Sequence, residues 1–229
     1  MPLPIAAKPE DVGIDSEKLE AVFARAQRDV DDGTLQGCQV AVARGGVLAG
    51  FRSFGKAAIQ GELHPVTDDT LYVIFSSTKA IVAAAVWTLF EDGLLRLDEK
   101  VAEIIPEFGT NGKEVITVEQ TMLHIGGFPM APFRAEDWDN RETSLARFAK
   151  WRLNFEPGTQ FIYHATTAHW ELAEIIELRT GNAFRSFIRE RILDPRGLDN
   201  LYIGLPDRET SRVADVLHMV PPVPPPGGW

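Results

Sequence analysis

A long apolar segment, from Ser77 to Glu91, constrains the fold of this chain more than any other feature. It is rich in Ala, Val and Leu and carries almost no polar residue, and Asp92 and Gly93 behind it supply a stop signal for a helix. A helix that is apolar on nearly all of its sides is buried on nearly all of them. The segment therefore predicts a helix at the hub of the core, with Trp87 as a core residue.

The residues before this central helix predict another helix and a hairpin. Apolar side chains recur at helical spacing after Asp15, and residues 31–33 would end that helix. Residues 38–43 and 47–54 are β-prone runs separated by 44–46, where glycine provides the positive φ that a tight turn requires. The two runs predict paired antiparallel strands.

The residues after the central helix predict mostly helix and loop. Short apolar runs occur at 101–105 and 118–123, and helical patterns at 143–152, 167–180 and 183–193. Two early strands followed by helices leave an incomplete sheet, because a lone hairpin is marginally stable and exposes its edges. We therefore expect a companion polypeptide or a further C-terminal segment to complete the sheet.

Charge and composition exclude several classes of partner. The net charge is −10 and no cluster of Lys or Arg interrupts the acidity, so nucleic acid is not an expected partner. Cys38 is the only cysteine, which excludes an intrachain disulfide and a cysteine-based metal site. The N-terminus lacks the pattern of a secretory signal, and no apolar stretch is long enough for a membrane span. We expect a cytoplasmic protein, unless a leader has been removed.

Ser76 and Lys79 stand at the beginning of the predicted central helix as a Ser-x-x-Lys pattern. The i, i+3 spacing places both side chains on one face, so the amine can reach the hydroxyl. A serine hydroxyl becomes a strong nucleophile when a neighbour takes its proton, and an apolar setting lowers the pKa of a lysine toward that task. A capping serine followed by a solvated lysine gives the same pattern by chance. The flanking sequence therefore has to distinguish a catalytic pair from a chance match.

The flanking sequence is specific. It reads VTDDTLYVIFSSTK at 66–79, LFEDGLLRLDEKV at 89–101, LHIGGFP at 123–129, EPGTQFIYH at 156–164 and LDPRGLD at 193–199. From about Gly13 to Pro206 the chain resembles the serine β-lactamase-like superfamily, which includes class C β-lactamases, family VIII carboxylesterases and D-alanyl-D-alanine peptidases. The resemblance implies an α/β (α+β) fold with helices packed on an antiparallel sheet, and an acyl-enzyme mechanism. We expect this domain over residues 1–220, without the C-terminal strands, and a Pro-rich tail or loop over 221–229.

The resemblance also assigns a third catalytic residue. Tyr163 matches the tyrosine of the superfamily's second motif, where a phenol can relay a proton between the nucleophile, the lysine and the leaving group. The alternative is a half-buried core aromatic. The family implies no cofactor, and no spacing signature for a metal site is present.

Two departures from the family pattern bear on the substrate. Many relatives read Tyr-Ser-Asn, but this chain reads Tyr163-His164-Ala165, so the amide that helps to hold a β-lactam is absent. The third motif, such as Lys-Thr-Gly on a later strand, has no match. That strand supplies the second oxyanion-hole donor in the family, and losing one such donor costs on the order of 10²–10³ in rate. Either a companion chain supplies this donor, or the fragment is impaired.

Several residues near these motifs are candidates for substrate binding. Phe128, Phe133 and Trp138 lie in an irregular, Pro-containing stretch, and loops on a rigid scaffold often form binding walls. His164, beside the tyrosine, is assigned to the same wall. His124 precedes a Gly-Gly pair and is expected to brace a tight loop beside the site.

These features predict a cytoplasmic serine esterase that cleaves small carboxylic esters through an acyl-enzyme on Ser76. One alternative keeps the mechanism and changes the substrate to a β-lactam, a D-alanyl peptide or another amide. Another alternative is a non-catalytic fragment or binding module that retains the fold.

Overall fold

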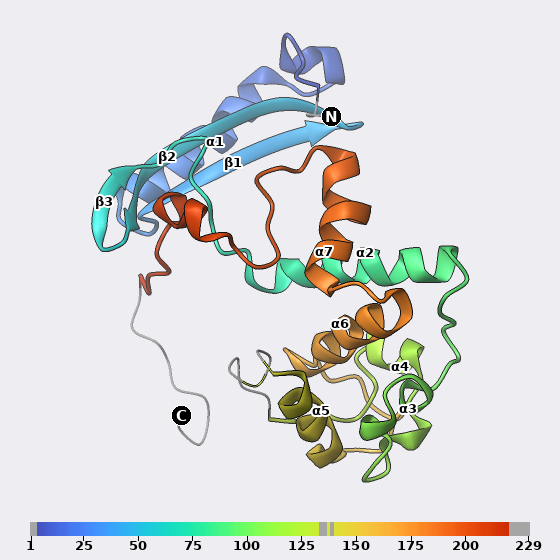
Figure 1. Cartoon of the computed structure of the whole chain (residues 1–229). Helices are drawn as coiled ribbons and strands as arrows, with labels where there is room; N and C mark the ends of the chain where they lie inside the picture. Colours follow the sequence, from blue (N-terminus) through green and yellow to red (C-terminus); the bar gives the residue numbers. More distant parts are fainter. Residues whose placement is uncertain (1–3, 133–136, 138–139, 220–229) are drawn as a thin grey trace. The chain divides into compact units, whose positions relative to one another are not determined.

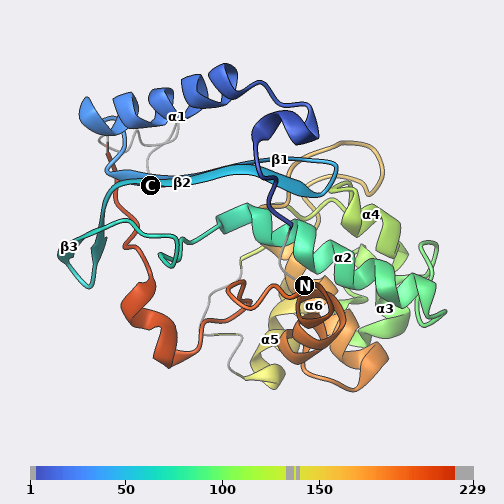
Figure 2. The same cartoon turned by 90° about the horizontal axis from the view of Figure 1, so that it is seen from above.

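The computed structural model describes residues 4–132, 137 and 140–219. Contacts divide the chain into two compact units (Figures 1 and 2). The sheet unit contains the residues up to Ile74 and those from Gly204 onward, and the helical unit is Phe75–Ile203. The single domain that the sequence predicts over 1–220 therefore contains two units, and the predicted tail at 221–229 lies outside the described residues.

The sheet unit is a three-stranded antiparallel sheet with one long helix on it (Figure 1). Its elements are α1 (Ser16–Asp31), β1 (Gly37–Arg44), β2 (Val47–Ile59) and β3 (Glu62–Pro65), with 3₁₀ turns at Pro9–Val12 and Asp207–Arg212. The strand order is β1-β2-β3. The helix and hairpin predicted before the central helix are confirmed.

Side chains of α1 pack on the sheet in the way its apolar spacing predicts. Asp15 caps the helix, because its carboxylate accepts a hydrogen bond from the Lys18 amide at 3.0 Å. Leu19 and Phe23 are buried against the sheet, and a Cβ added at Gly50 would lie 3.0 Å from both side chains. A glycine at that position of β2 therefore lets the helix approach the strand closely.

The third strand was not predicted from the sequence. The turn between β2 and β3 is formed by Gln60 and Gly61, both with positive φ, at 54° and 85°. Two left-handed residues in a two-residue connection are typical of the hairpin turn whose twist matches paired strands. The x-Gly dipeptide is the signal that could have identified this hairpin.

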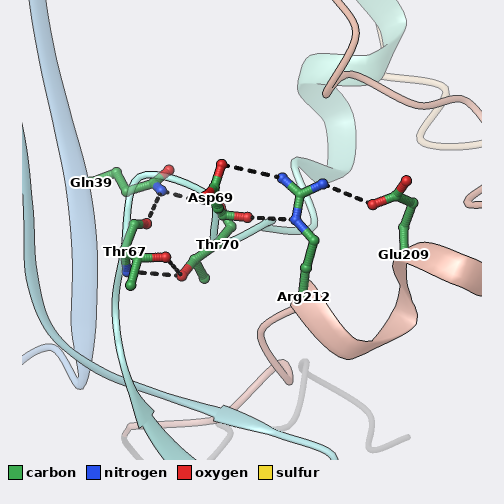
Figure 3. A network of polar contacts seen from close by, with 6 residues as sticks. All are labelled: Gln39, Thr67, Asp69, Thr70, Glu209 and Arg212. Atoms are coloured by element: carbon green, nitrogen blue, oxygen red, sulfur yellow. Dashed lines mark hydrogen bonds and ion pairs between the residues drawn. The ribbon is translucent and has the colours of Figure 1, made fainter.

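The described C-terminal segment returns to the sheet unit. Ala214 donates to the Leu71 carbonyl at 2.8 Å, and Asp215 donates to the Ala58 carbonyl at 2.7 Å. Figure 3 shows how Arg212 contributes, since its Nε donates to the Asp69 carbonyl at 3.0 Å. Within this unit, residues far apart in the sequence are therefore joined by hydrogen bonds.

The described part of the helical unit contains the predicted central helix, α2, and five further α-helices (Figure 1). Its helices are α2 (Thr78–Glu91), α3 (Val101–Ile104), α4 (Val118–Met122), α5 (Arg141–Lys150), α6 (Thr167–Thr180) and α7 (Phe184–Ile188). A π-helical turn at Arg189–Leu193 continues α7, and 3₁₀ turns occupy Phe75–Ser77, Pro106–Phe108, Lys113–Val115 and Asp194–Arg196. The helical segments expected from the sequence are confirmed, and the described residues of this unit contain no strand.

One face of α2 is the hub of the core. Val82, Val86 and Leu89 are buried in a cluster that includes Trp151. Trp87, however, is 57% exposed, so its predicted place in the core is wrong. An all-apolar helix does not reveal by its own sequence which face is covered. In the part of the chain that the structure describes, no helix is long and apolar enough to span a bilayer.

Candidate active site

Ser76 occupies the turn that leads into α2. This turn spans Phe75–Ser77, and the Ser76 side chain is exposed ahead of the first helical residue, Thr78. Phe75 has a φ of 44°, which is the left-handed region that a bulky residue adopts only under strain. Strain of this kind is held in place by the surrounding structure and gathers at functional sites. The α2 N-terminus next to Ser76 favours negative charge that develops there.

Lys79 is placed as the Ser-x-x-Lys spacing predicts. It lies in the first turn of α2, and its Nζ donates a hydrogen bond to Ser76 Oγ at 3.1 Å. The distance allows proton exchange between the two groups.

Tyr163 comes to the same place from a distant segment. Lys79 Nζ lies 5.1 Å from the centroid of the Tyr163 ring. Hydrogen bonding with Ser76, and then with Lys79, lowers the pKa of the Tyr163 phenol. The side chain is 47% exposed, so it is not the core aromatic of the alternative interpretation. The structure thus brings together all three residues predicted as catalytic.

His124 holds the backbone on both sides of Tyr163. Its carbonyl accepts from the Ile162 amide at 3.3 Å, and its Nδ1 accepts from the His164 amide at 3.1 Å. The His124 ring lies 4.9 Å from the Tyr163 ring. His124 has a φ of 59°, so two of the four described non-glycine residues with positive φ, Phe75 and His124, lie at this site.

Phe128 and His164 were predicted to bind substrate, but the structure places both in the interior. Each is 0% exposed. His164 Nε2 accepts from the Phe128 amide at 3.1 Å, and Nδ1 pairs with the Ile162 carbonyl at 2.6 Å, so both ring nitrogens are engaged. Burial lowers the pKa of His164, which keeps the imidazole neutral. This histidine joins the 124–128 loop to the tyrosine segment and presents no surface to a ligand.

The other two predicted wall residues, Phe133 and Trp138, lie outside the described residues. Their assignment to substrate binding stays a prediction.

His169, on α6, is a feature that the sequence interpretation missed. Both of its ring nitrogens are buried, and neither makes a hydrogen bond of normal geometry. Burial, together with the charges of Lys79 and His124, lowers the pKa of His169 to about 4, and a weak interaction with the Lys79 backbone acts in the opposite direction. No pattern in the sequence identifies it as buried, because buried residues occupy several faces of α6.

The depressed pKa of His169 predicts acid sensitivity. In the unfolded chain this imidazole is protonated below about pH 6.5. In the folded protein it is protonated only below about pH 4. The free energy of unfolding therefore falls as pH decreases through this window, by up to about 3 kcal/mol from this group. We expect His169→Phe to reduce that loss and to leave stability at pH 7 equal or higher, as measured by urea unfolding at pH 7, 5.5 and 4. The exposed His218→Phe serves as control, and an equal acid loss in wild type and His169→Phe would contradict the assignment.

Comparisons with known proteins identify similar sequences and structures. The Beta-lactamase family model matches residues 22–229. Esterase EstB from Burkholderia gladioli is 29% identical over 227 residues, covering 90% of this chain and 56% of that protein. A solved structure described as a novel penicillin-binding protein homolog from Caulobacter crescentus has a TM-score of 0.80 and 33% identity, covering 93% of this chain and 57% of its own. A family VIII carboxylesterase has a TM-score of 0.77 and 30% identity, covering 88% of this chain and 55% of its own.

These matches confirm the β-lactamase-like α/β fold that the sequence predicts. The chain spans about half the length of each of these three relatives.

Proposed function

The chain belongs to the beta-lactamase family, and on that premise we propose that it is the nucleophile-bearing part of a serine hydrolase that cleaves small carboxylic esters. One observation carries the proposal. Lys79 Nζ lies 3.1 Å from Ser76 Oγ, and the Tyr163 phenol interacts with both groups. A nucleophile, a proton acceptor and a proton donor in mutual reach are the parts that acyl transfer requires.

Acylation follows from this arrangement. Ser76 Oγ attacks the ester carbonyl while its proton passes into the pair formed by Lys79 and Tyr163. The tetrahedral intermediate collapses, the ester C–O bond breaks, and the phenol delivers a proton to the leaving alkoxide. Water then attacks the acyl-enzyme with the same two residues as base, and Ser76 recovers its proton when the carboxylic acid leaves.

Ala165 supports an ester rather than a β-lactam as substrate. Its methyl group stands where many relatives have an asparagine amide, so that hydrogen bond to a substrate amide is absent. An ester needs less help, because an alkoxide leaves more readily than an amine. A relative named as an esterase and a similar structure described as a carboxylesterase agree with this choice.

The oxyanion formed during attack needs backbone donors. We propose that the N–H of Ser76, in the turn that leads into α2, is the first of these donors. We propose that further polypeptide supplies the second donor, as expected from the missing third motif. Assays should therefore include the longest natural form of the protein.

Two measurements on the same sample test this proposal. Treatment with a fluorophosphonate followed by intact-mass and peptide mass spectrometry should give one adduct, on Ser76. Turnover of nitrophenyl butyrate should exceed turnover of a chromogenic cephalosporin in kcat/KM. A cephalosporin rate above the ester rate would favour the β-lactamase alternative, and no adduct on a folded sample would favour the non-catalytic one.

His124 is expected to act as a positioning residue for Tyr163. His124→Ala removes the Nδ1 acceptor, and misplacement of a catalytic group by about 1 Å costs about 10²-fold in rate. We expect that loss in kcat with little change in KM. His124→Asn should recover most of the activity, because the asparagine Oδ1 is attached to Cγ as Nδ1 is and asparagine tolerates a positive φ. Equal activity of the alanine and asparagine variants would contradict this role.

A further inference from the structure

A pocket of about 240 Å³ opens beside Lys79 in the helical unit. Residues on both sides of Ser76 in the sequence, Phe75 and Thr78, line it together with Lys79. The rest of its wall is mainly apolar and includes Val82, Ala165, Trp170, Ala173, Phe184 and Ile203. The pocket therefore adjoins the residues next to the proposed nucleophile, although Ser76 itself does not line it, and it extends between α2, α6 and the start of α7.

The wall of this pocket offers almost no charge. Among the described residues that line the pocket, His169 is the only imidazole, and it is neutral at pH 7 because its pKa is about 4. Lys79 is the one lysine or arginine among these described residues, and its amine is hydrogen-bonded to Ser76. A carboxylate or ammonium group at the far end of the pocket, away from Lys79, would lose its hydration, and the described residues there offer it no charged partner.

We propose that this pocket receives the acyl group of the substrate, so that the enzyme selects esters of uncharged, apolar carboxylic acids. The inference rests on the proposed esterase function and goes further by naming the acid. The acyl group stays bonded to Ser76 Oγ through the catalytic cycle, so its chain must lie in a space adjoining that atom.

The position of Tyr163 distinguishes the acyl group from the alcohol. Tyr163 delivers the proton to the departing alkoxide and is about half exposed. Neither Tyr163 nor Ser76 lines the pocket, but Lys79, whose amine is hydrogen-bonded to Ser76, does. The alcohol therefore leaves on the side of the phenol, toward solvent. The acyl chain occupies the opposite side, along Lys79 and His169.

The proposal predicts how the rate depends on acyl chain length. Burial of one methylene contributes about 0.8 kcal/mol, which corresponds to about a fourfold gain in kcat/KM. We expect nitrophenyl esters from acetate upward to gain about fourfold for each added methylene, until the pocket is filled and the gain stops. A terminal carboxylate, as in the adipate monoester compared with the hexanoate ester, should lower kcat/KM by about tenfold or more.

Two variants change the pocket in opposite directions. Ala165 is exposed and lines the pocket, so Ala165→Leu should narrow it and shift the preferred ester to a shorter chain without disturbing the core. Phe184→Ala should enlarge it and shift the preference to a longer chain. Trp87→Ala, on α2 but outside the pocket, is the matched control and should keep the wild-type profile.

The outcomes separate the pocket from the catalytic function. Opposite shifts in the two variants, with all proteins labelled on Ser76 by a fluorophosphonate, would support the proposal. An unchanged chain-length profile in both variants, with labelling and turnover intact, would overturn the acyl pocket and leave the esterase function standing. Failure of the folded wild-type protein to be labelled or to turn over any ester would overturn both.

Discussion

Ser76→Ala should abolish ester hydrolysis, with kcat/KM falling by on the order of 10⁴-fold or more. In the proposed mechanism this hydroxyl bonds to the acyl carbon, and without it Lys79 loses the oxygen that lies 3.1 Å from its amine. The free energy of unfolding should change by less than about 0.5 kcal/mol, because the side chain is exposed. Steady-state assays with nitrophenyl butyrate and urea unfolding measure the two effects.

Ser77 provides the control for this experiment. It is the adjacent serine and precedes α2, but its side chain makes no capping hydrogen bond. Ser77→Ala should therefore keep fluorophosphonate labelling and most of the turnover. Retention of full activity by a folded Ser76→Ala protein would remove Ser76 as the nucleophile.

Tyr163→Phe should lower kcat by about 10²–10⁴-fold through the loss of one proton-transfer group. The change should also alter the pH profile. Interactions with Ser76 and Lys79 hold the pKa of the phenol below its usual value of about 10, so the basic form that accepts a proton becomes populated as pH rises through this lowered pKa. The alkaline rise in wild-type kcat/KM should begin below pH 10 and should be absent in the variant.

Tyr72→Phe is the matched control, since it makes the same chemical change at a tyrosine of the sheet unit. Its kcat and pH profile should equal those of the wild type. A Tyr163→Phe enzyme that retained the alkaline rise would assign the titrating base to another group.

Local patterns were sufficient for most of the fold. The cap at Asp15, the glycines at 45 and 46 and the apolar run of α2 act through neighbours in sequence, so the elements that they define could be predicted. Strand β3 is short and exposed, and only the Gln60-Gly61 turn indicates it. The exposure of Trp87 depends on which helices cover α2, and that is a property of packing rather than of the segment.

The candidate site could be predicted in part. The i, i+3 spacing of Ser76 and Lys79 is local, and the resemblance supplied Tyr163. His124 holds the backbone on both sides of Tyr163 through hydrogen bonds between residues about forty positions apart, and no local pattern encodes such bonds. Phe128 was misplaced for a related reason, because an irregular loop sequence does not indicate which of its side chains point inward.

All three proposed catalytic residues, and the pocket beside them, belong to one contact unit, Phe75–Ile203. Its boundaries follow Ile74 and precede Gly204, so the nucleophile is the second residue of the unit. A chimaera that receives this whole segment from a relative should therefore also receive the acyl-chain preference of that relative. A crossover point inside the segment would combine Ser76 of one relative with the tyrosine and the pocket wall of another.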